Sequence, residues 1–224
     1  RVPAPAHMTG LAALHEFARA GGIVKRIWGA LRGTYFQNAI QVGSYYLDVA
    51  NDTVNPNKDD VELLPLAEAG FRNVESFSEF ETVGRLYWKC HTIPNRYFPN
   101  LAPYYPLVTF SKRGMIRLDS ANSFMFPMNI VKGFEPAREF VFGSETAGAD
   151  LDPYVAFMAR LAATDPRMSD PDALLYFSPA PDRARLEESF ARVRRLGPDA
   201  LEADVQRVLG TDPRLWSVAP ANGR

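Results

Sequence analysis

Carboxylate and amide side chains gather where one strongly patterned stretch of the sequence ends. Asp48 lies within a run of aromatic and β-branched residues, and Asn51 and Asp52 follow at the end of that run. The oxygen atoms of such side chains are the ligands that hard cations such as Mg²⁺ and Mn²⁺ prefer. We therefore expect Asp48, Asn51 and Asp52 to hold one of these cations as a cofactor. The alternative is that Asn51 and Asp52 form a turn while Asp48 faces solvent.

A proline-rich segment, residues 89–106, holds the second group of side chains that could take part in chemistry. Its four prolines restrict the backbone to an extended or turning path, and loops often carry binding residues. His91 in this segment and Asp119 further along are candidate general bases, and Asp48 is the third candidate catalytic residue. The residues expected to bind substrate are Lys89, Arg96, Tyr97, Tyr104 and Arg117.

The chain has a single cysteine, Cys90, directly before His91. A thiolate–imidazole pair would suit a hydrolase, but the side chains of sequence neighbours normally diverge, and no nucleophile motif accompanies this pair. A hydrolase that uses Cys90 or a serine is therefore a weaker hypothesis than an enzyme that uses the carboxylates. One cysteine also excludes an intramolecular disulfide and a cysteine-rich zinc site, and it fits a reducing compartment such as the cytoplasm.

The candidate metal ligands depend on a β-hairpin that we predict over residues 36–51. Gly43 and Ser44 form its two-residue turn, which places Val42 opposite Tyr45. Because side chains alternate along a strand, this register separates an apolar face from a polar face, and we expect burial of the apolar one. The apolar face consists of Phe36, Ile40, Val42, Tyr45, Leu47 and Val49. The polar face consists of Gln37, Ala39, Gln41, Tyr46, Asp48 and Ala50.

A second hairpin is predicted over residues 107–119, with a three-residue turn at 112–114. Its register pairs Phe110 with Ile116 and creates one apolar face. If both hairpins belong to the same sheet, their polar side chains share one side of it. Those side chains are Gln41, Asp48, Arg117 and Asp119.

The pattern as a whole predicts an α+β fold: a mainly antiparallel sheet built on the two hairpins, with N-terminal helices and a helical C-terminal region. Helices are expected over residues 9–20, 23–31, 76–88, 152–163, 186–196 and 201–209. Further strands are expected over residues 61–66, 124–131 and 140–142. After residue 143 every basic residue is an arginine, and those between 183 and 195 alternate with carboxylates as on a solvated helix.

Length and composition limit the organisation of the chain and its partners. The 224 residues suit one large domain or a domain with a small appendage. We expect an α+β domain over residues 8–143, a helical region over 144–224 packed on it, and an expression remnant or disordered segment over 1–7. A net charge of −1 gives no basic surface for nucleic acid, and uncharged runs of at most 15 residues are too short to span a membrane.

The leading functional hypothesis is an enzyme that acts on a polar small molecule, in particular a metal-assisted sugar or nucleotide-sugar transferase. The metal would bind a diphosphate and offset the charge of the leaving group, while the aromatic loop would stack on sugar rings. The alternative is a non-catalytic protein-binding or assembly protein that uses loop 92–106 as its interface, because tyrosine and arginine dominate interface hot spots. Its ligand would then be a protein partner.

Overall fold

The chain forms two compact units. The computed structural model describes residues 8–49, 61–110, 115–121, 124–143, 152–211 and 214–217. The first unit comprises Arg1–Val74 and the second Glu75–Arg224. The fold is α+β with antiparallel sheets, as predicted. The expected helical region 144–224 belongs to the second unit together with residues 75–143, and its separation as a domain stays a prediction.

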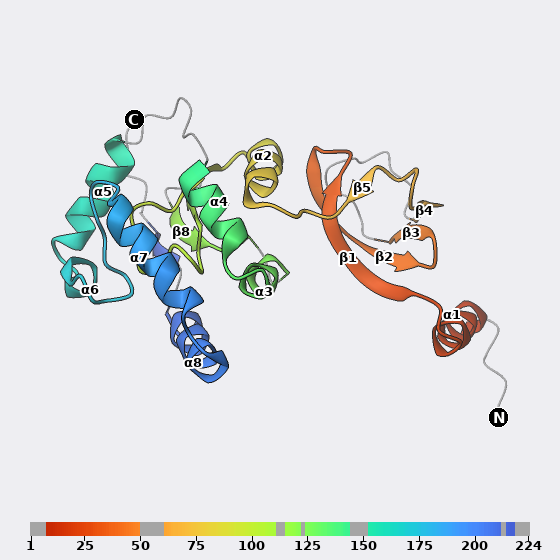
Figure 1. Cartoon of the computed structure of the whole chain (residues 1–224). Coiled ribbons are helices and arrows are strands. Elements are labelled where there is room, and N and C mark those ends of the chain that lie inside the picture. Colours follow the sequence, from red (N-terminus) through yellow and green to blue (C-terminus); the bar gives the residue numbers. More distant parts are fainter. Residues whose placement is uncertain are drawn as a thin grey trace, which may run out of the picture. The chain divides into compact units, whose positions relative to one another are not determined.

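The described residues of the first unit form one helix and a five-stranded antiparallel sheet (Figure 1). The strand order across the sheet is β4-β3-β2-β1-β5, so the strand predicted over 61–66 lies at an edge, as its proline requires. The elements are α1 (Thr9–Arg19), β1 (Val24–Leu31), β2 (Tyr35–Val42), β3 (Tyr45–Asp48), β4 (Glu62–Pro65) and β5 (Phe71–Arg72).

The second of the expected N-terminal helices is wrong, because residues 23–31 contain strand β1 instead. This strand pairs with β2 along all eight of its residues. Its Val, Ile and Trp side chains favour strands, and the complete ladder satisfies the backbone as well as a helix would. The connection to β2 places Arg32 and Gly33 at φ of 52° and 69°, as the tight turn of a hairpin requires.

The first predicted hairpin forms with the expected register, but along β3 the opposite face is buried, whereas Phe36 on β2 is buried as expected. Val42 pairs with Tyr45, as predicted. Tyr46 and Asp48, from the face expected to be polar and open, are only 0% and 1% exposed. Tyr45 and Val49, from the face expected to be buried, are 49% and 57% exposed. The prediction of the buried face is therefore wrong along β3.

The curl of the sheet explains which face is covered. Strand β5 pairs with the end of β1, and its last residue lies so close that a Cβ atom on Gly29 would be 2.1 Å from the carbonyl oxygen of Arg72, so only glycine fits there. Phe71 on β5 packs against Tyr46, with the ring centroids 5.8 Å apart. The curled β1 is visible in Figure 1. Contacts between strands distant in sequence thus decide which side of the hairpin is buried.

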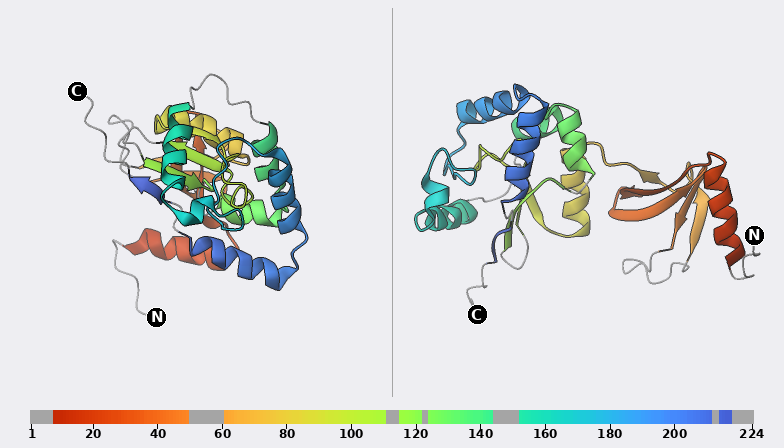
Figure 2. Two further views of the ribbon diagram at one scale, coloured as in Figure 1. Left: turned by 90° about the vertical axis from the view of Figure 1, so that its left-hand side faces the viewer. Right: turned by 90° about the horizontal axis from the view of Figure 1, so that it is seen from below.

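The second unit consists of a four-stranded antiparallel sheet, in the order β6-β7-β8-β9, with helices on more than one side of its strands (Figure 2). Its strands are β6 (His91–Pro94), β7 (Leu107–Phe110), β8 (Met115–Asp119) and β9 (Arg214–Ser217). Its helices are α2 (Phe77–Tyr87), α3 (Met125–Val131), α4 (Glu135–Gly143), α5 (Asp152–Ala162), α6 (Pro166–Ser169), α7 (Arg183–Arg194) and α8 (Pro198–Leu209). None of the described helices is long and apolar enough to cross a membrane.

The second predicted hairpin has the expected register, with Phe110 opposite Ile116, although its turn at 112–114 lies outside the described residues. It belongs to a different sheet from the first hairpin. The common polar side expected from Gln41 and Asp48 together with the second hairpin is therefore not formed by one sheet.

The predicted strands at 124–131 and 140–142 are wrong, because both segments lie in the helices α3 and α4. A short apolar run does not distinguish a buried strand from a buried helix. Tertiary hydrogen bonds hold the corner between the two helices: the buried Asn129 donates to the carbonyl of Pro103 at 2.8 Å and accepts from the backbone N–H of Ala137 at 3.1 Å.

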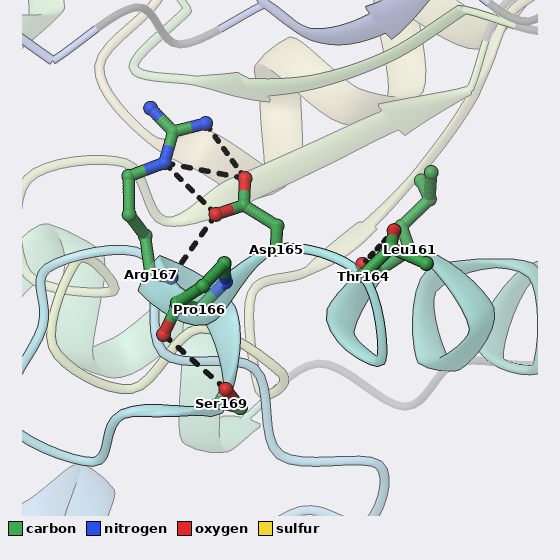
Figure 3. A network of polar contacts seen from close by, with 6 residues as sticks. All are labelled: Leu161, Thr164, Asp165, Pro166, Arg167 and Ser169. Atoms are coloured by element: carbon green, nitrogen blue, oxygen red, sulfur yellow. Dashed lines mark hydrogen bonds and ion pairs between the residues drawn. The ribbon is translucent and has the colours of Figure 1, made fainter.

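A polar network caps the short helix α6 (Figure 3). The carboxylate of Asp165 accepts hydrogen bonds from the backbone N–H of Arg167 at 3.0 Å and from its Nη2 at 2.6 Å. The side-chain hydrogen bonds of Arg167 lower the pKa of Asp165. Thr164 donates to the carbonyl of Leu161 at 2.9 Å and closes the end of α5. This network fixes the corner from which Met168 is buried in the core.

Candidate functional site

The carboxylate of Asp48, the first predicted metal ligand, lies in the interior of the first unit. It accepts hydrogen bonds from the amide of Gln37 and from the hydroxyl of Tyr46, the latter at 3.2 Å. Burial, together with the charge of Asp48 and this hydrogen bond, raises the pKa of Tyr46, so its hydroxyl keeps its proton. Asn51 and Asp52 lie outside the described residues, so the metal site stays a prediction. Within the described part of the chain, no group of three or more His, Cys, Asp or Glu could hold a metal ion.

A second carboxylate near Asp48 was missed by the sequence analysis. Glu62 on β4 lies directly opposite Asp48 on β3. Its Oε1 accepts a hydrogen bond from Nη2 of Arg32 at 2.8 Å. The register between β3 and β4 is not set by a tight turn, because thirteen residues separate Asp48 from Glu62, so local sequence gave no signal for this pairing.

His91 and Asp119, the other predicted catalytic residues, lie on opposite faces of the second sheet. His91 pairs with Phe110, whereas Asp119 pairs with Leu107, three residues before Phe110 on the same strand. Nε2 of His91 is buried without a hydrogen-bond partner among the described residues. The structure therefore does not bring these two residues together, and Asp48 belongs to the other unit.

The carboxylate of Asp119 is paired with Arg117, which was predicted to bind substrate. It accepts hydrogen bonds from the guanidinium of Arg117 and from the backbone N–H of Ala121, the latter at 2.9 Å. Burial raises the pKa of Asp119, although Arg117 and the backbone N–H groups oppose the shift. On the same face, Thr92 and Thr109 share a hydrogen bond at 3.3 Å. These contacts stabilise the sheet and leave Arg117 half-exposed.

The other predicted substrate-binding residues are spread over surface and core. Lys89 is exposed, and Nε of Arg96 donates to the carbonyl of Val141 at 2.7 Å. Tyr97 and Tyr104 are buried. Buried side chains cannot contact a protein partner, so these two tyrosines give the interface hypothesis no support.

A pocket of 380 Å³ in the second unit collects arginine side chains from two helices. Helix α7 contributes Arg185, Glu188, Ser189 and Arg192, and α8 contributes Arg207. The four positions of α7 are spaced by three, four and seven residues from the first, which places them on one face of the helix. Arg185 and Arg192 were expected on a solvated helix, and nothing in the sequence indicated that they converge with Arg207.

The buried Asp204 on α8 holds two of these arginines. Its carboxylate lies 3.1 Å from Nη1 of Arg192 and accepts hydrogen bonds from Arg207 and from the hydroxyl of Tyr104, the latter at 2.5 Å. Burial opposes ionisation of Asp204, but the hydrogen bonds from Tyr104 and Arg207 and the two positive charges outweigh it and lower its pKa. One negative charge thus faces two positive charges.

Arg185 is held by contacts that involve no carboxylate. Nη2 donates to the carbonyl of Pro171 at 2.6 Å, and the guanidinium lies 4.6 Å from the ring centroid of Tyr176. Nε is buried and has no partner in the described part of the chain. Asn100 donates to the carbonyls of Pro171 and Ala173 at 2.9 and 2.7 Å and thereby fixes this wall of the pocket. Arg185 can therefore meet an anion without first breaking an ion pair to a described carboxylate.

The chain matches no protein-family model, no curated protein and no solved structure.

Proposed function

We propose that the second unit binds a small molecule through a phosphate or carboxylate group in the arginine pocket. The observation that carries this proposal is the convergence of Arg185, Arg192 and Arg207 on one cavity of 380 Å³. This volume lies within the range of about 300–1,000 Å³ that is usual for small-molecule sites. Guanidinium groups present several N–H donors in a fixed plane and match the oxygen atoms of phosphate and carboxylate.

The contacts of the guanidinium groups support an anionic ligand, although the carboxylates of Asp172 and Glu188 in the same lining reduce the net positive charge of the pocket. Asp204 compensates only one of the two guanidinium groups that it contacts, and Arg185 pairs with no described carboxylate. The pocket is open to solvent at exposed side chains, so a ligand can enter without an opening of the core. An anion bound beside Arg185 gains charge-assisted hydrogen bonds, which are stronger than neutral ones.

This proposal covers the small-molecule part of the leading hypothesis. The transfer reaction, its sugar or nucleotide-sugar donor and the Mg²⁺ or Mn²⁺ ion at Asp48 remain predictions. The protein partner of the alternative hypothesis, the absence of nucleic-acid binding and the cytoplasmic location also remain predictions.

Titration of the full chain with inorganic phosphate at constant ionic strength tests the proposal. We expect saturable binding by calorimetry and a rise of the unfolding midpoint, because a ligand that binds only the native state stabilises it. Arg185→Gln is expected to weaken binding by about tenfold or more, since a hydrogen bond to a charged group contributes about 1.5–3 kcal/mol.

Arg195→Gln is the matched control, because it removes the same charge at the exposed end of the same helix. It is expected to leave the affinity within about twofold, as a screened surface charge has little effect. Equal losses in the two variants, or no saturable binding by the wild type, would contradict the proposal.

A further inference from the structure

The arginine pocket also carries two carboxylates, and they restrict which anion fits. Asp172 lies on the segment that Asn100 fixes, and Glu188 lies on α7 between Arg185 and Arg192. Both carboxylates are exposed, and neither is paired with a described residue. The lining of the pocket therefore combines three positive groups with two free acceptors of hydrogen bonds.

We infer that the ligand is a phosphorylated polyhydroxy compound, that is, a sugar phosphate of monosaccharide size. This inference rests on the proposed function. The arginines bind the phosphate, and Asp172 and Glu188 accept hydrogen bonds from hydroxyl groups. Carboxylates have acceptor oxygens and no donor when ionised, so they suit a ligand part that carries O–H donors.

The same carboxylates disfavour a ligand with several anionic groups. Asp172 and Glu188 repel a second phosphate placed near them, because like charges in a partly desolvated pocket raise the free energy of the complex. A diphosphate or triphosphate chain would extend from the arginines toward these residues. The charge pattern therefore favours a single phosphate group.

The lining of the pocket disfavours a nucleobase. The cavity of 380 Å³ is large enough for a monosaccharide phosphate. None of the described residues that line the pocket is aromatic. A nucleobase would find no ring to stack on, although base–aromatic stacking is the usual way to hold one.

Calorimetric titration of the full chain compares four ligands: inorganic phosphate, glucose 6-phosphate, pyrophosphate and phosphoethanolamine. We expect glucose 6-phosphate to bind at least about tenfold more tightly than inorganic phosphate, and pyrophosphate to bind no more tightly than inorganic phosphate. In the double variant Asp172→Ala, Glu188→Ala, the advantage of glucose 6-phosphate is expected to fall within about threefold, while inorganic phosphate binds as well as before or better.

Glu187→Ala is the control, because Glu187 is an exposed carboxylate on the same helix that pairs with Arg183 and does not line the pocket. It is expected to retain the full advantage of glucose 6-phosphate. Binding of inorganic phosphate with no gain for glucose 6-phosphate overturns this inference and leaves the proposed function standing. Tighter binding of phosphoethanolamine than of glucose 6-phosphate overturns it as well, because the carboxylates then recognise an ammonium group. Failure of all four ligands to bind overturns both proposals.

Discussion

Replacing Asp204 by alanine is expected to lower the free energy of unfolding of the second unit by about 3 kcal/mol. The variant leaves the hydroxyl of the buried Tyr104 without its acceptor. It also leaves Arg192 and Arg207 as neighbouring positive charges without the carboxylate between them. Removal of one member of a buried charged network is costly because its partners stay desolvated. Urea unfolding of the full chain, with hydrogen exchange of α7 and α8 to assign the transition, measures the change.

Two further variants separate the network from the charge of the helix. Asp199→Ala removes an exposed carboxylate from the first turn of α8 and is expected to cost only about 0.5 kcal/mol through the helix dipole. Tyr104→Phe removes one hydrogen bond and is expected to cost about 1 kcal/mol. Its effect is expected to be smaller in the Asp204→Ala background, since the hydroxyl no longer has this partner. A loss from Asp204→Ala as small as that from Asp199→Ala would show that the network does not stabilise the unit.

The pKa of Asp204 also gives the network a pH dependence. Because the folded-state pKa lies below the ordinary value of 3.8, its contribution to stability is fully present above about pH 4 and is lost as the pH falls through the lowered pKa. Asp119 acts in the opposite direction, since its raised pKa makes ionisation of the native state costly as the pH rises above 3.8. Wild type and Asp204→Ala share Asp119, so the difference between them isolates Asp204. That difference is expected to shrink below about pH 4.

The local sequence pattern predicted which residues pair across the strands better than it predicted which side chains are buried. The two-residue turn at Gly43 and Ser44 determines which residues face each other, so the register of the first hairpin was predicted correctly. The choice of the buried face depends on the curl of the sheet and on β5, which approaches at Gly29. Neither is encoded in the alternation of the hairpin, because the face that is buried carries Gln37 and Asp48 beside Tyr46, and the alternation therefore points to the other face. Tertiary contacts likewise outweigh the helical spacing of the apolar residues in the segment 23–31, which contains strand β1.

Part of the arginine pocket could have been predicted from the sequence. The spacing of Arg185, Glu188, Ser189 and Arg192 marks one face of a helix, and this polar face could have been read as a site. The position of Arg207 in this pocket depends on how α8 packs against the rest of the unit, and no local sequence pattern predicts that packing. The same applies to Tyr104, whose hydroxyl bonds a carboxylate 100 residues away in the sequence. The sequence of an aromatic, proline-rich loop is compatible with an exposed surface and with a buried core. The tertiary contacts of its side chains decide between the two.

Replacing Asp48 by alanine is expected to destabilise the first unit by about 3 kcal/mol. The variant removes the acceptor of the Gln37 amide and of the Tyr46 hydroxyl, both buried, and it leaves a small cavity. An unsatisfied buried donor costs about 1–3 kcal/mol. Asp48→Asn keeps one acceptor oxygen and nearly the same volume, so it is expected to cost less than half as much. Hydrogen exchange of β1, β2 and β3 in the full chain measures both changes.

The same variants decide between a structural carboxylate and the predicted metal ligand. Glu68→Ala removes an exposed carboxylate from the same unit and is expected to leave its stability within about 0.5 kcal/mol. If Asp48 is structural, Asp48→Ala accelerates hydrogen exchange in the absence of any metal. If Asp48 instead binds Mg²⁺ or Mn²⁺ together with Asn51 and Asp52, the metal raises the unfolding midpoint of the wild type, and Asp48→Ala and Asp52→Ala both abolish that rise. An unchanged rate of exchange in metal-free Asp48→Ala would contradict the structural role, because a carboxylate with two buried donors cannot be removed without cost.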